Sequence, residues 1–204
     1  MTAVIVIRQS RRIHLITDGL LDTPVGPKVA AKAFMLPHLP ALVALRGPAF
    51  VTAFLPFLSA APTLDDIAIG LPGLLREFRS GFASIFSKTD PLGAEMDIII
   101  AGPSAKHGPV TMFATTSETH GAPTYATHYV SSPVVALPGD HGAQEAIAEM
   151  VGDPDACDLR AVAGSLMRRQ AEVTGARIGG FVQLSTVELG NSSMRTEVVE
   201  RWEM

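Results

Sequence analysis

The sequence predicts an α+β fold, a four-layer αββα sandwich in which two stacked β-sheets lie between two helical layers. Three observations lead to this expectation. Strand-forming blocks alternate with two pairs of helical segments, in the order strands, helices, strands, helices, strands. Apolar residues make up 47% of the chain and charged residues only 18%, which suits extensive buried layers. A length of 204 residues fits a single domain, residues 1–204.

The first part of the chain predicts two pairs of strands. Residues 2–8 and 12–17 are apolar and rich in β-branched side chains, and the short turn between them indicates a hairpin. A second pair is expected over residues 32–36 and 39–46, which Pro37 separates. Proline is tolerated at the ends and edges of sheets, so it marks the boundary between these two strands.

Two helices are expected next. An apolar stretch covers residues 48–61, where Pro48 takes the favoured first helical position and Pro56 predicts a kink or a break. The sequence Thr63-Leu-Asp-Asp66 resembles a helix-starting cap, and it precedes a helix expected over residues 67–79.

The second half of the chain repeats the alternation. Strands are expected over residues 96–101 and 109–116, with a weaker strand candidate over residues 125–136. Two helices with clear start and stop residues are expected over 140–151 and 153–174. Two final strands are expected over residues 181–188 and 195–202.

Charge and cysteine content exclude some classes of function. The net charge is -4 and the sequence has no basic cluster, so the electrostatic footprint that nucleic-acid binding needs is missing. A single cysteine, Cys157, can form neither an internal disulfide nor a cysteine-based metal site. The six histidines show no metal-ligand spacing, and the sequence has no glycine-rich phosphate loop. We therefore expect neither a cofactor nor a metal.

The apolar stretch of residues 47–64 is long enough to cross a bilayer, but three prolines interrupt it. The apolar run near the N-terminus is too short for a signal-peptide core, and its arginines follow it instead of preceding it. We expect a cytoplasmic protein that is not inserted in a membrane.

Several short motifs resemble one known family. They are Met1-Thr-Ala-Val-Ile-Val6, Ile16-Thr-Asp18-Gly19, Lys32-Ala-Phe34, Ala44-Leu-Arg-Gly47 and Ile178-Gly-Gly-Phe-Val-Gln-Leu184. In this order and spacing they resemble the proteasome β-type and bacterial HslV-type peptidases, which belong to the N-terminal-nucleophile hydrolases. The resemblance covers nearly the whole chain and implies the αββα fold.

The resemblance also implies a site. Thr2, Asp18, Lys32 and Gly47 fall on the positions of the nucleophile, the carboxylate, the lysine and the oxyanion donor. Removal of Met1 would expose the α-amine of Thr2, a suitable base for the threonine hydroxyl. Positive charge on a nearby lysine lowers the pKa of both groups, and a carboxylate fixes that lysine. A backbone N–H at a strand-to-helix junction can stabilise the oxyanion. The implied activity is that of a threonine peptidase or amide hydrolase.

Other positions depart from the family pattern. Gly175 and Ile178 stand where the family has an aspartate and a serine, and residues 138–140 replace another serine. Lys28 is a competing lysine between Asp18 and Lys32. An alternative therefore stays open, in which the chain is an inactive scaffold subunit of a larger assembly or phage-type particle.

The resemblance implies a homo-oligomeric ring that encloses the Thr2 face and admits peptides or unfolded proteins. The high apolar content and the weakly polar helix over residues 48–61 agree with an oligomer interface. The sequence does not identify an unfoldase partner.

Overall fold

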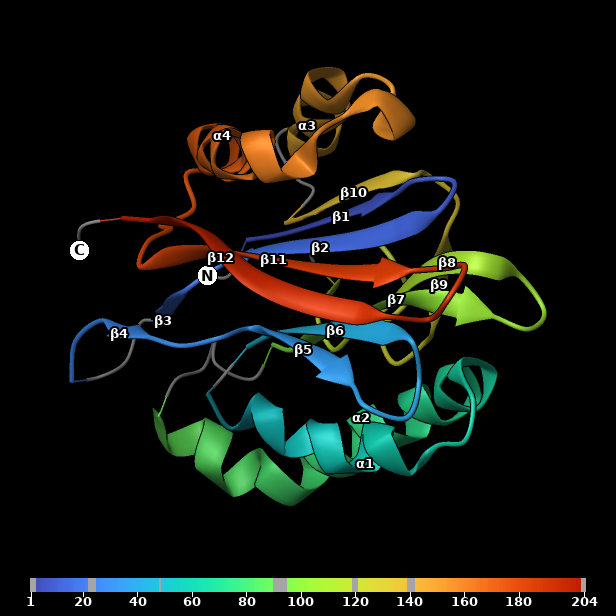
Figure 1. The fold of residues 1–204 in the computed structure, drawn as a ribbon. Coiled ribbons are helices and arrows are strands. Elements are labelled where there is room, and N and C mark those ends of the chain that lie inside the picture. Colours follow the sequence, from blue (N-terminus) through green and yellow to red (C-terminus); the bar gives the residue numbers. More distant parts are fainter. Residues whose placement is uncertain are drawn as a thin grey trace.

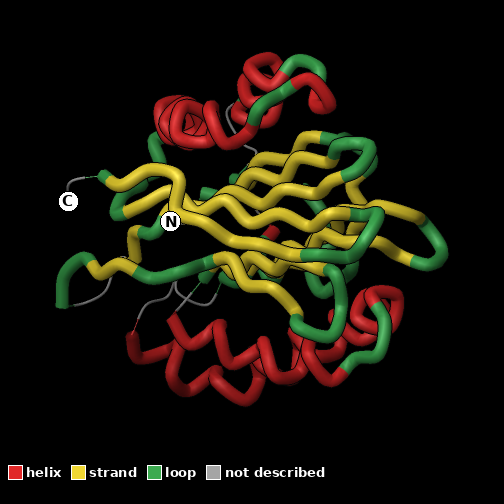
Figure 2. The backbone as a smooth tube through the Cα atoms, viewed as in Figure 1, coloured by secondary structure: helices red, strands yellow, loops and turns green. Residues whose placement is uncertain are grey.

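The computed structural model describes residues 3–21, 25–47, 49–89, 95–118, 121–138 and 142–202. Within these ranges the protein has a mixed α and β architecture, with two five-stranded antiparallel sheets and helices on both sides of them (Figure 1). Figure 2 shows the long helices above and below the strands.

The upper sheet of Figure 1 has the strand order β10-β1-β2-β11-β12. Its strands are β1 (Val4–Arg8), β2 (Arg12–Asp18), β10 (Val134–Leu137), β11 (Phe181–Glu188) and β12 (Met194–Arg201). The expected hairpin of β1 and β2 is confirmed, because Ile5 lies opposite Ile16 and Gln9 N donates to Arg12 O at 2.8 Å.

The lower sheet has the order β5-β6-β7-β8-β9. Its strands are β5 (Ala33–Leu36), β6 (Ala41–Arg46), β7 (Asp97–Ser104), β8 (Gly108–Thr115) and β9 (His128–Val130). A separate two-strand ribbon, β3 (Leu20–Leu21) with β4 (Lys28–Val29), extends from the end of β2. The expected pairing of the strand before Pro37 with the strand after it is confirmed.

Two helical groups cover the outer faces of the sheets. The lower group is η1 (Ala49–Phe54), α1 (Leu55–Ala60) and α2 (Leu64–Thr89), and the upper group is α3 (Ala143–Val151), η3 (Pro154–Ala156) and α4 (Leu159–Thr174). One apolar cluster joins α1 and α2 to the lower sheet, and another joins α3 and α4 to the upper sheet. A third lies between the sheets and includes Val6, Leu15, Leu42 and Ile99.

The strand expected over residues 125–136 is wrong as one element. The structure contains two strands there, β9 in the lower sheet and β10 in the upper sheet. The crossing between them is held by Arg8, whose guanidinium donates to the carbonyls of Val130, Ser131 and Ser132 at 2.6–3.0 Å. The turn-forming residues of this crossing interrupt the strand pattern, which explains the division.

Helix boundaries differ from the expectation in three places. The helix expected over residues 67–79 is the longer α2, which continues through Pro72 because Leu71 and Leu75 on its inner face are buried against the sheet. The break expected at Pro56 falls just before that residue, where η1 changes to α1. Pro56 thus lies in the first turn of α1, where a backbone N–H would have no partner within the helix. The helix expected over 153–174 is divided into η3 and α4, since Asp158 caps α4 by accepting from Arg160 N at 3.1 Å.

Candidate active site

A buried ion pair joins the two sheets. Asp18 is the last residue of β2 and Lys32 directly precedes β5, and Lys32 Nζ lies 2.9 Å from Asp18 Oδ1. Asp18 is 0% exposed and Lys32 is 6% exposed. The competing Lys28 is an exposed residue of β4. The structure therefore brings together the carboxylate and the lysine that the sequence singled out.

The carboxylate of Asp18 also accepts hydrogen bonds from two backbone N–H groups. Its Oδ1 accepts from the backbone N of Ala3 at 3.3 Å, and its Oδ2 accepts from Leu20 N at 2.9 Å. Ala3 follows Thr2, and Thr2 itself lies outside the described residues. The peptide group that contains the Ala3 nitrogen is thus hydrogen-bonded to the same oxygen that binds Lys32.

Gly47 lies at the turn between β6 and η1, as the sequence predicts. Its φ is +133°, and a Cβ at this position would lie 2.8 Å from the Glu95 carbonyl oxygen. Both the conformation and the available space therefore require glycine. The strand that leads to Gly47, β6, also contacts the backbone of Lys32, since Leu45 N donates to Lys32 O at 3.3 Å. Gly47 therefore follows, by two residues, the residue of β6 that is hydrogen-bonded to Lys32.

The glycine pair before β11 lies beside Asp18. Gly19 N donates to Gly179 O at 3.1 Å, and a Cβ on Gly19 would meet the Phe181 ring at 2.7 Å. This close approach explains why glycine follows Asp18. Upstream, Gly175 ends α4 in a left-handed conformation and Ile178 packs against the upper core, so neither supplies a polar side chain.

The sequence analysis missed a second buried ion pair. Arg46 Nη1 lies 2.5 Å from Asp97 Oδ2, and both side chains are less than one tenth exposed. The two residues are direct partners on β6 and β7, and Gly47 follows Arg46. The available signal was a single charge at the end of each of two apolar strands. The pair holds the strand end from which the Gly47 turn begins.

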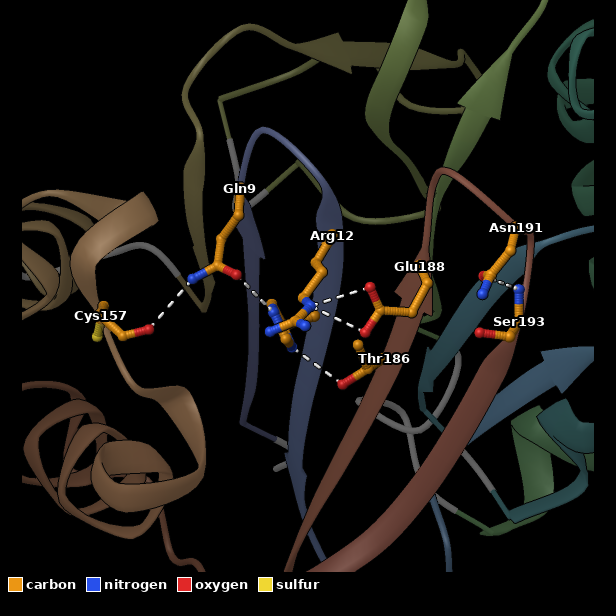
Figure 3. Close-up of polar contacts among 8 residues, drawn as sticks. Gln9, Arg12, Cys157, Thr186, Glu188, Asn191 and Ser193 are labelled. Carbon is orange, nitrogen blue, oxygen red and sulfur yellow. Dashed lines mark hydrogen bonds and ion pairs between the residues drawn. The ribbon is translucent and has the colours of Figure 1, made fainter.

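A different polar cluster lies towards the turn between β1 and β2. His14 is buried, with Nδ1 3.0 Å from Thr186 Oγ1 and Nε2 3.0 Å from Gln9 Oε1. Figure 3 shows Gln9 reaching towards the backbone of Cys157, and Arg12 paired with Glu188. Burial, followed by the charges of Arg12 and Arg195, lowers the pKa of His14 to about 4. This histidine is therefore neutral at pH 7, which suits a structural role.

The described residues contain no group of three or more histidine, cysteine, aspartate or glutamate residues that could hold a metal ion. In the same residues, no helix has both the length and the apolar character needed to span a membrane.

Comparison with solved structures identifies the fold. A mutant Anbu from Hyphomicrobium sp. strain MC1 has a TM-score of 0.69 at 16% identity, over 98% of this chain and 87% of that chain. The chain has the proteasome-type N-terminal-nucleophile fold. Anbu from Yersinia bercovieri, an ancestral beta-subunit, shares this proteasome-type fold with a TM-score of 0.69 at 12% identity, over 97% and 87% of the two chains.

A third structure of the proteasome-type fold is BPH from Thiobacillus denitrificans, with a TM-score of 0.61 at 20% identity, over 93% of this chain and 99% of that chain. BPH has also been solved in complex with epoxomicin. In sequence, the chain matches no family model and none of the curated proteins compared with it. The resemblance inferred from short motifs is therefore confirmed at the level of the fold.

Proposed function

We propose that the protein is a threonine peptidase or amide hydrolase with Thr2 as its nucleophile. One observation carries this proposal. Asp18 Oδ1 binds both Lys32 Nζ and the backbone N of Ala3, so a buried lysine and the residue after Thr2 share one carboxylate oxygen. An ion pair buried at this point is costly unless it is well hydrogen-bonded, and its position beside the N-terminal strand suits the activation of Thr2.

The proposed reaction begins after Met1 is removed. The α-amine of Thr2 takes the proton of the Thr2 hydroxyl while the hydroxyl oxygen attacks the substrate carbonyl carbon. The oxyanion that forms accepts a hydrogen bond from the backbone N–H of Gly47. The protonated amine then gives its proton to the leaving amine, the C–N bond breaks, and an ester on Thr2 remains. Water hydrolyses this ester and restores the hydroxyl.

Lys32 and Asp18 have supporting roles in this scheme. The ammonium of Lys32 favours the neutral amine and the developing negative charge on the threonine oxygen, because like charges repel and opposite charges attract. Asp18 keeps the long lysine side chain in place and needs no direct contact with the substrate.

The comparisons support the proposal in one respect. The fold is shared with BPH, which binds the proteasome inhibitor epoxomicin, and with Anbu. We propose that the sheets and helices form the four-layer αββα sandwich of these hydrolases in one domain. The large exposed side chains of Phe57 and Ile69, on α1 and α2, support a homo-oligomeric, HslV-like ring around the Thr2 face. Such a ring would admit short or unfolded peptides.

Hydrolysis of a panel of short fluorogenic peptides tests the proposal. We expect turnover by the wild type, reduced but measurable turnover by Thr2→Ser, which keeps a hydroxyl, and none by Thr2→Ala. Equal turnover by wild type and Thr2→Ala would assign the activity to another group or to a contaminant, and would overturn the proposal.

A second candidate is an inactive scaffold subunit in a larger assembly. It is favoured by Gly175 and Ile178, which place no carboxylate or hydroxyl where the family pattern has them. Protein that lacks Met1, assembles fully and hydrolyses no peptide of the panel would support this function instead.

A further inference from the structure

The distance between Lys32 and Asp18 depends on the separation of the two sheets. Asp18 belongs to the upper sheet, whereas Lys32 leads into β5 of the lower sheet. In the described part of the chain, β5 pairs only with β6 and is an edge strand. Edge strands are the least constrained part of a sheet, because one side of the backbone has no strand partner. Something else must therefore hold the Lys32 end of β5 against the upper sheet.

Gln183 of β11, in the upper sheet, makes a direct hydrogen bond to the lower sheet. Its Nε2 donates to the backbone carbonyl of Ala33 at 2.9 Å, and the side chain is buried. Successive carbonyls of a strand point to opposite sides, and the Lys32 carbonyl already accepts from β6. The Ala33 carbonyl therefore faces the free edge of β5, where Gln183 satisfies it.

Both ends of this contact are next to the ion pair. Ala33 follows Lys32, and Gln183 lies directly opposite Thr17, the residue before Asp18. The same Nε2 lies 3.0 Å from Thr196 Oγ1 of the neighbouring strand, which fixes the orientation of the amide. The contact therefore joins the backbone beside the lysine to the strand that neighbours the aspartate.

The amide is not the simplest way to fill this space. Gln183 Oε1 and Thr17 Oγ1 are buried, and neither has a hydrogen-bond partner within the residues that the structure describes. Unpaired buried polar atoms cost free energy, and an apolar side chain of similar size would avoid that cost. The hydrogen bond to Thr196 stays within the upper sheet, so the hydrogen bond to Ala33 is the contact by which this amide reaches the lower sheet.

We propose that Gln183 is a positioning residue that keeps Lys32 at hydrogen-bonding distance from Asp18. Its effect on catalysis rests on the proposed function, but its effect on the ion pair does not. Gln183 acts through the backbone of Ala33 and does not touch a substrate.

The test measures the protection of Lys32 in the full-length protein. The chain has four lysines, and acylation of each by a water-soluble amine reagent can be followed by peptide mass spectrometry. Exposed Lys106 serves as the internal reference. Gln183→Met keeps the size of the side chain and removes the donor. Gln183→Leu is a second variant, an apolar side chain that also lacks a hydrogen-bond donor.

Gln144→Met is the matched control. Gln144 of α3 also donates to a backbone carbonyl at the free edge of an edge strand, Val134 O of β10 at 2.6 Å, but it does not bridge the sheets. We expect both Gln183 variants to raise the acylation rate of Lys32 relative to Lys106 by about tenfold, by analogy with the lower end of the effect of losing a hydrogen bond that supports a metal ligand. Gln144→Met should leave that ratio unchanged.

Peptide hydrolysis supplies a second readout. Gln183→Met should lower kcat about tenfold with little change in KM, because substrate contacts are retained while the lysine moves. Unchanged Lys32 protection in both Gln183 variants would overturn the proposal, as would equal exposure of Lys32 in Gln144→Met. If the wild type hydrolyses nothing, the proposed function fails and the acylation ratios still decide the role of Gln183.

Discussion

Asp18 ends a strand of the upper sheet and Lys32 directly precedes an edge strand of the lower sheet, yet Lys32 Nζ lies 2.9 Å from Asp18 Oδ1 and both residues are buried. The same carboxylate oxygen accepts from Ala3 N. The ion pair therefore links the lower sheet, the upper sheet and the residue that follows Thr2. Both its stability and its chemistry can be tested.

Removal of the lysine should destabilise the protein. Lys32→Met leaves the Asp18 carboxylate buried without its counter-ion, and breaking a buried pair in this way typically costs about 3–5 kcal/mol. Chemical denaturation of Lys32→Met and of Lys106→Met, a change at an exposed lysine, measures the difference. Equal free energies of unfolding for the two variants would show that the pair contributes nothing to the fold.

Two buried threonine hydroxyls should respond differently to the same substitution. Thr186 Oγ1 lies 3.0 Å from His14 Nδ1, whereas Thr17 Oγ1 is buried and unpartnered within the described residues. Valine has nearly the shape of threonine but lacks its hydroxyl. Thr186→Val should lose about 1 kcal/mol, and Thr17→Val should be neutral or stabilising. Thermal or chemical unfolding checks both, and the reverse order would contradict the assigned hydrogen bonds.

The neutral state of His14 predicts a dependence of stability on pH. Its pKa in the folded protein is lowered to about 4, below the ordinary value of 6.5. The unfolded chain therefore binds a proton at this histidine before the folded protein does. The stability that neutral His14 contributes is fully present above pH 6.5 and is lost as the pH falls towards 4. The free energy of unfolding then falls by at most about 3 kcal/mol.

Unfolding free energies between pH 4 and 7 test this effect. His14→Gln should flatten the dependence in that window, whereas His38→Gln, at an exposed histidine, should not. A wild-type profile that is flat between pH 6.5 and 4 would be inconsistent with a buried neutral His14.

Assembly should depend on the exposed apolar side chains of the α1 and α2 surface. Phe57 is 57% exposed and Ile69 is 73% exposed, on neighbouring helices. Replacing both with lysine places two charges in a surface that we propose to be buried between subunits, so the oligomer should dissociate while each subunit stays folded. Light scattering with circular dichroism measures both properties. Met150→Lys on α3 is the control, and an unaffected oligomer in the double variant would contradict this interface.

The elements of the fold were predictable because their signals are local. Apolar β-branched runs identified β1 and β2, and proline and glycine identified most boundaries. The helix expected over residues 67–79 runs through Pro72, and the burial of Leu71 and Leu75 outweighs the cost of that proline within α2. The division of residues 125–136 between two sheets has a local signal in the turn-forming residues 131–133, but the Arg8 contacts that hold the crossing come from far away in sequence.

The candidate site was predictable only where a family motif marks it. Asp18, Lys32 and Gly47 were identified from such motifs. Arg46 and Asp97 are 51 positions apart and look like unrelated strand-end charges until β6 and β7 are paired. Gln183 lies within the motif of residues 178–184, but its role was hidden, because its partner is a backbone carbonyl 150 positions away. Contacts of this kind depend on which distant strands pair and on how the two sheets pack, so no residue spacing in the sequence reveals them.

The central claim is that Thr2, freed of Met1, is the nucleophile served by Asp18 and Lys32. Intact-mass spectrometry before and after incubation with epoxomicin tests it most directly, with Thr2→Ala as the control. We predict a wild-type mass without Met1 that increases by one inhibitor molecule per subunit, and no increase for Thr2→Ala. Complete retention of Met1, or an increase that persists in Thr2→Ala, would contradict the claim.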